Sequence, residues 1–94
     1  QMCIRDRRII LSENNTHLLI VDDDERILSL LSAYLSKNKF LVSSARNSTE
    51  ARDLLNYFEF DLLILDVMMP GESGLELLEG IRNQTNVPAI FLSA

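Results

Sequence analysis

Hydrophobic and polar positions along the chain follow two patterns, short apolar blocks and longer stretches with helical periodicity. Apolar blocks predict buried strands over residues 18–21, 60–65 and 87–92, and a short run of β-forming residues predicts a further strand over 40–45. The stretches between the blocks repeat apolar residues at the spacing of a helix with one buried face, at Ile27, Leu30, Leu31, Tyr34 and Leu35, then Ala51, Leu54, Leu55 and Phe58, then Leu75, Leu78 and Ile81. The predicted order of elements is β-α-β-α-β-α-β.

Polar residues predict where these helices begin and end. Asp24 is expected to cap the first helix, and residues 37–39, Lys-Asn-Lys, are suited to ending it. Asn47 stands three residues before Glu50, which is the spacing of a capping box, and is expected to open the second helix. Residues 70–74, Pro-Gly-Glu-Ser-Gly, predict a turn before the third helix.

Strands that alternate with helices predict an α/β fold with right-handed crossovers. The sheet is expected to be mainly parallel, doubly wound and covered by helices on both faces. In the strand order 2-1-3-4, the first, third and fourth strands are neighbours. Groups at the carboxyl ends of these strands then lie at one edge of the sheet.

Composition limits the chain to one domain and narrows the class of protein. With 94 residues and 47% apolar content, the chain is just below the common domain size, so we expect one domain, not necessarily a complete one. The longest apolar runs are far too short for a membrane span, and a single cysteine with no secretory signal favours the cytoplasm. From residue 17 onward, six Lys or Arg stand against twelve Asp or Glu, so nucleic-acid binding by this chain alone is not expected.

The two ends of the chain do not fit the pattern. Residues 1–6 resemble the translation of a sequencing adapter, and we expect residues 1–14 to be non-native or a disordered tail. The last two residues, Ser93 and Ala94, follow a predicted strand directly. Residues 15–94 are therefore interpreted as a partial domain that stops before its fold is complete.

Chemistry is concentrated at the carboxyl ends of three predicted strands. Asp22 and Asp23 follow the first strand, Asp66 follows the third, and Ser93 follows the fourth. Three carboxylates close together repel one another, which favours a bound cation. All the available ligands are oxygens, so Mg²⁺ is preferred over zinc. A carboxylate beside Mg²⁺ can attack phosphorus to form an acyl phosphate, and Ser93 can donate a hydrogen bond to the transferred group.

Three sequence motifs resemble those of response-regulator receiver domains, most closely the subfamily that precedes winged-helix transcription factors. They are Leu-Leu-Ile-Val-Asp-Asp-Asp at 18–24, Leu-Leu-Ile-Leu-Asp-Val-Met-Met-Pro-Gly at 62–71, and Pro-Ala-Ile-Phe-Leu-Ser-Ala at 88–94. The resemblance covers residues 17 to 94. It implies the flavodoxin-like receiver fold in the order 2-1-3-4, with the fifth strand and the last two helices missing from this chain.

The resemblance also implies roles for individual residues. Asp66 is the expected phosphoacceptor and a metal ligand. Asp23 is expected to bind Mg²⁺ directly and Asp22 through water, while the backbone carbonyl of Met68 completes the protein's share of the coordination. The side chain of Met68 is interpreted as apolar filler.

The switch region is only partly present. Ser93 matches the family's Ser/Thr switch position, and Ala94 is small enough to leave the phosphoryl group accessible. The family's lysine and its aromatic switch residue belong to the missing fifth strand. The surface through which activated members of this subfamily form homodimers belongs to the missing part as well, so we expect this chain to switch poorly and to be marginally stable.

The function implied is that of a cytoplasmic signalling module. It would accept a phosphoryl group from a sensor histidine kinase without turning over a metabolite, and so would not be an enzyme in the usual sense. DNA would be reached only through an output domain, absent here, that controls transcription.

The acidic residues allow three other interpretations. The aspartates could serve only as helix caps, which is the role preferred for Asp24 but not for Asp22, Asp23 and Asp66 together. An Mg²⁺-dependent phosphohydrolase of the haloacid-dehalogenase type could use a strand-end aspartate, but it needs a second acid where this chain has Met68. A degenerate receiver that acts only as an interaction surface is disfavoured for the parent protein by the intact acidic residues, but this interpretation stays open for the present chain. Glu76 and Glu79 are expected to form a solvated helix face.

Overall fold

The computed structural model describes residues 16–92, which form four strands and three helices. In chain order they are β1 (His17–Val21), α1 (Glu25–Lys37), β2 (Leu41–Ala45), α2 (Ser48–Tyr57), β3 (Leu62–Asp66), α3 (Gly74–Ile81) and β4 (Ala89–Leu92). The predicted alternation of strands and helices is confirmed. The predictions for residues 1–14, Ser93 and Ala94 lie outside the described residues.

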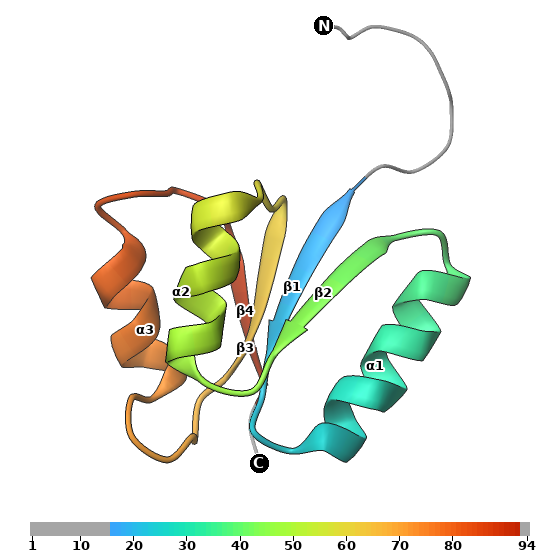
Figure 1. Cartoon of the computed structure of the whole chain (residues 1–94), viewed down its shortest axis with the longest axis horizontal. Helices are drawn as coiled ribbons and strands as arrows, with labels where there is room; N and C mark the ends of the chain where they lie inside the picture. The colour runs from blue at the N-terminus through green and yellow to red at the C-terminus, as the bar shows by residue number, and fades with distance from the viewer. Residues whose placement is uncertain (1–15, 93–94) are drawn as a thin grey trace, which may run out of the picture.

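The sheet is parallel and has the order β2-β1-β3-β4, as predicted (Figure 1). Helix α1 lies on one face of the sheet, and α2 and α3 lie on the other (Figure 1). Val21 pairs with both Ala45 and Leu65, and Asp66 pairs with Leu92. The strands therefore end at nearly the same level, which places the residues that follow them along one edge.

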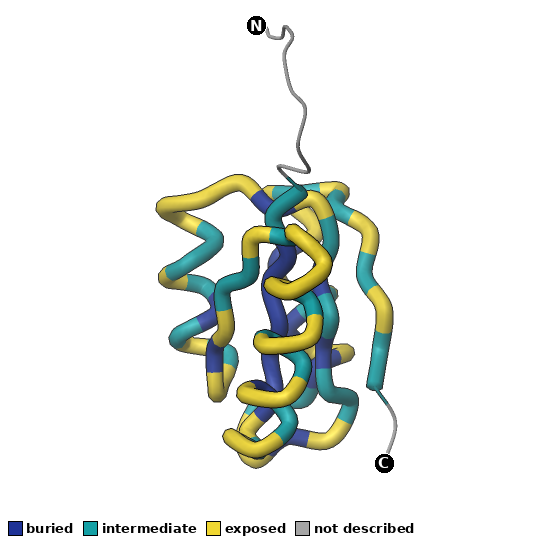
Figure 2. The backbone as a smooth tube through the Cα atoms, turned by 90° about the vertical axis from the view of Figure 1, so that its right-hand side faces the viewer, coloured by how far each residue is buried: buried dark blue, intermediate teal, exposed yellow. Residues whose placement is uncertain are grey.

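The hydrophobic core lies between the sheet and the pair α2 and α3. Successive side chains of a strand point to opposite faces, so every second residue of β1 and β3 enters this core. Leu19, Leu63 and Leu65 are fully buried there, together with Leu77 of α3. Figure 2 shows the buried segment running through the middle of the molecule, while the outer side of the helix in front of it is exposed.

Three strands begin later than the apolar blocks predict. Strands β2, β3 and β4 start at residues 41, 62 and 89 rather than 40, 60 and 87. Phe60 is buried, but it precedes the first residue of β3 in the chain. Pro88 has no N–H to donate, and its carbonyl accepts a hydrogen bond from the Leu63 N–H at 2.9 Å, so regular pairing of β4 starts after it. Apolar runs therefore mark burial more reliably than they mark strand ends.

The predicted buried face of α1 is partly wrong. Leu28 is the buried residue of this helix, whereas Leu30 and Tyr34 are 68% and 63% exposed. Within the part of the chain that the structure describes, α1 is the one helix on its face of the sheet and packs against β1 and β2. The side of α1 that turns toward β3 and β4 is consequently left uncovered.

The faces of the other two helices also differ in detail. Phe58 follows the end of α2 and is half exposed, and Leu75 of α3 is 52% exposed, whereas Leu77 is fully buried. Glu76 is more than a solvated residue, because it forms a capping box with Ser73. The Ser73 hydroxyl accepts from the Glu76 N–H at 3.2 Å, and the Glu76 carboxylate accepts from the Ser73 N–H at 3.0 Å.

No helix within residues 16–92 is long and apolar enough to cross a membrane.

Candidate functional site

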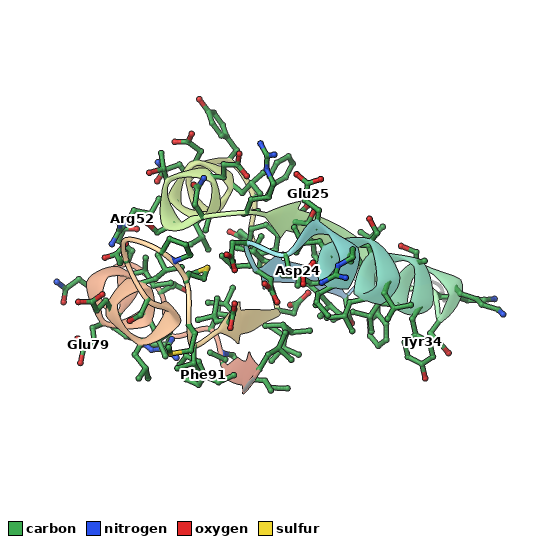
Figure 3. All side chains as sticks on the ribbon, turned by 90° about the horizontal axis from the view of Figure 1, so that it is seen from below. Asp24, Glu25, Tyr34, Arg52, Glu79 and Phe91 are labelled. Carbon is green, nitrogen blue, oxygen red and sulfur yellow. The ribbon has the colours of Figure 1, made fainter. Side chains whose placement is uncertain are left out.

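The carboxyl edge of the sheet positions the acidic side chains. Asp22 follows β1 directly, and its N–H extends the sheet by donating to the Ala45 carbonyl at 3.1 Å. Asp66 is the last residue of β3. Because Val21 pairs with Leu65, Asp22 and Asp66 lie side by side on neighbouring strands. Figure 3 looks onto this edge.

Three of the predicted site residues meet at this edge. One carboxylate oxygen from each of Asp22, Asp23 and Asp66 can be chosen so that all three lie within 4.8 Å of one another. Asp22 is buried, Asp66 is half-buried and Asp23 is exposed. The arrangement is open to solvent on the side of Asp23, so an ion and a small ligand can approach from there.

Backbone N–H groups orient two of these carboxylates. Oδ1 of Asp22 accepts from the Asp24 N–H at 2.9 Å, and Oδ1 of Asp66 accepts from the Met68 N–H at 3.1 Å. Asp24 itself is engaged elsewhere, because its carboxylate accepts from the backbone and side chain of Arg26. The predicted role of Asp24 as the N-cap of α1 is confirmed.

The electrostatics of the site favour a bound cation. Burial raises the pKa of the Asp22 carboxyl, and the neighbouring carboxylates of Asp66 and Asp23 raise it further, against a lowering by the Asp24 N–H. In the absence of a cation, ionisation of Asp22 therefore destabilises the folded state. A divalent ion would relieve this destabilisation.

The donor set fits Mg²⁺. It consists of carboxylate oxygens from Asp22, Asp23 and Asp66 and leaves room for water, as a small hard cation requires. The site opens into a cleft of about 570 Å³, lined on one side by these acids and on the other by apolar residues of α1 and by Leu92. Met68 lies in the loop after Asp66, and Ser93 and Ala94 lie outside the described residues.

One residue that supports the site was missed in the sequence. Gly74, the first residue of α3, donates its N–H to the Val67 carbonyl at 3.3 Å. A Cβ at this position would lie 2.2 Å from the Asp66 carbonyl oxygen. The helix can therefore approach the backbone of the central aspartate only because residue 74 is glycine. The sequence shows this glycine at the end of the turn 70–74, but not what it touches.

Asp22→Asn is expected to stabilise the metal-free chain at pH 7 and to weaken Mg²⁺ binding at least tenfold. The amide removes a buried charge beside two others, and its oxygen can still accept from the Asp24 N–H. We expect a gain on the order of 1 kcal/mol, measured by urea unfolding in EDTA.

The gain in stability should depend on pH in a defined direction. A carboxyl whose folded-state pKa is raised destabilises the fold once it is ionised, and the penalty vanishes when it is protonated. The advantage of Asp22→Asn should thus be full at pH 7 and disappear as the pH falls through the raised pKa of Asp22 toward 3.8. An advantage that persists unchanged at pH 3 would show that it arises from packing instead.

Comparison with known proteins agrees with this geometry. The family model described as the response regulator receiver domain matches residues 18–94. Protein PetR of Rhodobacter capsulatus is 49% identical over 85 residues, which are 90% of this chain and 36% of that protein. The transcriptional regulatory protein ResD of Bacillus subtilis is 40% identical over 81 residues, 86% of this chain and 34% of that protein.

Solved structures show the same fold. The receiver domain of the Francisella response regulator 1452 superposes with a TM-score of 0.79 at 34% identity, covering 85% of this chain and 67% of that one. TrrA from Thermotoga maritima is a response regulator solved in complex with Mg(2+)-BeF. It superposes with a TM-score of 0.77 at 36% identity, and the match covers 84% of this chain and 70% of the TrrA chain.

The matches also show what share of each relative's length corresponds to this chain. The chain spans about a third of the length of the curated relatives and about two thirds of the solved receiver chains. The parallel four-stranded sheet, the acidic edge and the family match agree, and the chain belongs to the response regulator receiver domain family of two-component systems.

Proposed function

We propose that this chain accepts a phosphoryl group on Asp66 in an Mg²⁺-dependent reaction with a sensor histidine kinase. The observation that carries the proposal is the meeting of three carboxylates, from Asp22, Asp23 and Asp66, within 4.8 Å at the carboxyl edge of the sheet. Asp66 is the central acid, with its Oδ1 already held by the Met68 N–H. TrrA, which resembles this chain, was solved with Mg(2+)-BeF, and this supports the assignment of the metal.

In the proposed reaction, a carboxylate oxygen of Asp66 forms a bond to phosphorus. The bond between phosphorus and the donor's histidine nitrogen breaks at the same time, and that nitrogen keeps the electron pair and takes a proton from solvent. The product is an acyl phosphate on Asp66. Bound Mg²⁺ supplies positive charge that offsets the charge of the phosphoryl oxygens.

The remaining site residues would hold the metal ion and orient the phosphoryl group. Asp23 would bind the metal directly, Asp22 through water, and Met68 through its backbone carbonyl. The Ser93 hydroxyl would donate a hydrogen bond to the transferred phosphoryl group, and the small side chain of Ala94 would leave that group accessible. The module would therefore modify itself once per donor and would not turn over a metabolite.

The names of two relatives support a proposal about the wider role of the parent protein. ResD and the CpxR homolog are named transcriptional regulatory proteins, and this chain matches about a third of each. We propose that the parent is a cytoplasmic response regulator with a DNA-binding output domain and that it forms a homodimer when phosphorylated. The acidic receiver would then act on DNA only through that output domain.

The test uses the 94-residue chain with acetyl phosphate as the phosphodonor. We expect a mass gain of one phosphoryl group in MgCl₂ and none in EDTA, measured by intact mass spectrometry. Reduction with borohydride should convert the acyl phosphate at residue 66 into an alcohol that peptide mapping can locate. Circular dichroism before and after the reaction confirms that the chain remains folded.

Other results would favour the competing interpretations. A folded chain that gains no mass would indicate either a degenerate receiver or a reaction that needs the family's lysine, which has no counterpart among these 94 residues. Steady release of phosphate over many turnovers from simple phosphate esters would indicate a phosphohydrolase. The family match argues against the phosphohydrolase, and the three carboxylates of Asp22, Asp23 and Asp66 argue against a degenerate receiver.

A further inference from the structure

An ion pair outside the acidic site joins α2 to the loop that follows β3. Arg52 of α2 places Nη1 at 2.6 Å from Oε1 of Glu72 and Nη2 at 3.0 Å from Oε2. The two parallel hydrogen bonds make a bidentate pair, which fixes direction as well as distance. The pair lowers the pKa of Glu72 and raises that of Arg52, so both groups are charged at neutral pH.

The guanidinium of Arg52 also lies against the backbone of α3. A Cβ at Gly80 would stand 2.6 Å from Nη2 of Arg52. Gly80 therefore leaves the space that the guanidinium occupies. Figure 3 shows Arg52 on the side of α2 that faces α3 and the loop leading into it. This one side chain of α2 thus contacts two other segments of the fold, the loop and α3.

The loop held in this way is residues 67–73, between β3 and α3. Much of it is exposed: Met68 is 69% exposed, and Pro70 and Gly71 are exposed as well. Met69 is its buried apolar anchor. Glu72 is its polar anchor to α2. The same loop supplies the Met68 N–H that holds Oδ1 of Asp66.

We propose that the Arg52–Glu72 ion pair is a positioning device that holds loop 67–73 so that the Met68 N–H orients the Asp66 carboxylate toward Asp22 and Asp23. Its consequence for Mg²⁺ binding rests on the function proposed above. Arg52 touches none of the three carboxylates and acts through Glu72 and the loop.

The partial exposure of the pair makes the proposal testable without unfolding the chain. The side chains of Arg52 and Glu72 are 42% and 28% exposed, and pairs of this kind add little to global stability. Its loss should therefore change the loop more than the fold. Lysine at position 52 would keep the charge but not the two parallel bonds, so it should not restore full function.

Gly80→Ala provides a second variant whose effect on stability has the opposite sign. Alanine is a better helix former than glycine, so α3 itself should become more stable. The added methyl group must displace the end of Arg52, which is flexible and can move away. If loop 67–73 becomes looser while the variant is at least as stable as wild type, the change in the loop cannot be attributed to global unfolding.

The experiment compares wild type, Arg52→Gln, Arg52→Lys and Gly80→Ala with the control Lys37→Gln, which removes one exposed positive charge at the far end of α1. NMR measures exchange of the Met68 amide with water in EDTA and then the affinity for MgCl₂ alone. We expect exchange to rise about fivefold and affinity to fall at least threefold in Arg52→Gln, with smaller changes of the same sign in Arg52→Lys and Gly80→Ala. The control should match wild type.

The charge-swapped double variant Arg52→Glu with Glu72→Arg should recover part of both losses. Unchanged Met68 exchange and unchanged Mg²⁺ affinity in Arg52→Gln and Gly80→Ala would overturn the proposal. The exchange measurement needs neither metal nor phosphoryl group. A wild type that binds no Mg²⁺ would thus contradict the proposed function, while Met68 exchange would still decide the role of the pair.

Discussion

Asp66→Asn is expected to stay folded and to gain no phosphoryl group under conditions in which the wild type gains one. An amide is no nucleophile at neutral pH, so the bond to phosphorus cannot form. The asparagine oxygen can still accept the Met68 N–H, and the substitution removes one of three mutually repelling charges. The fold should therefore be as stable as the wild type or slightly more so, and the loss is a loss of chemistry alone.

Asp24→Asn is the matched control. It changes the same functional group two residues after the buried acid Asp22, yet Asp24 serves as the N-cap of α1 and is engaged by Arg26. Asparagine caps helices about as well as aspartate, so phosphorylation and stability should both be close to wild type. Intact mass and circular dichroism measure both variants side by side. Equal phosphorylation of Asp66→Asn and wild type would refute the assignment of the phosphoacceptor.

Gly74→Ala is expected to destabilise the chain by about 3 kcal/mol, enough to unfold a marginal domain, because the added carbon has no room. It would stand 2.2 Å from the Asp66 carbonyl oxygen and 3.0 Å from its carbonyl carbon, and both are backbone atoms. Either α3 moves away from the sheet or the end of β3 bends. In both cases the Asp66 carboxylate leaves its position beside Asp22.

Gly80→Ala is the matched control for this substitution. It introduces the same methyl group into the same helix, but there the nearest atom is the end of the flexible Arg52 side chain. Helix propensity favours alanine by about 1 kcal/mol, so this variant should be as stable as wild type or more stable. Urea unfolding followed by circular dichroism compares the two. Similar urea midpoints of unfolding for Gly74→Ala and Gly80→Ala would show that α3 can shift without a loss of stability.

Local patterns in the sequence were enough to predict the elements and the acidic edge. The apolar block at 18–21 and the helical spacing after Asp24 are short-range signals, and they identified β1, α1 and the cap between them. Parallel strands that end level then bring the acids after β1 and β3 together, so the meeting of Asp22 and Asp66 followed from topology. The Ser73–Glu76 capping box also has a local signal, a serine three residues before a glutamate, although only a turn and a solvated glutamate are predicted there from the sequence.

The details that were wrong or missed concern contacts between distant segments. Leu30 and Leu75 have the right spacing for buried residues, yet no pattern within a helix tells which side of it a neighbour will cover. The Arg52–Glu72 pair joins residues 20 positions apart, and the space at Gly80 is defined by a side chain on another helix. The roles of Ser93 and Ala94 and the nature of residues 1–14 stay predictions, since these residues lie outside the described part of the chain.

The sequence alone determined the kind and order of the elements, the parallel sheet and the set of acids at its edge, because burial periodicity and capping act over a few residues. Only the tertiary structure decided which face of α1 is covered, that Gly74 lets α3 approach Asp66, and that Arg52 reaches the loop behind the site. The physical reason is that these contacts depend on the close approach of segments far apart in the chain, and close packing allows or forbids such an approach atom by atom.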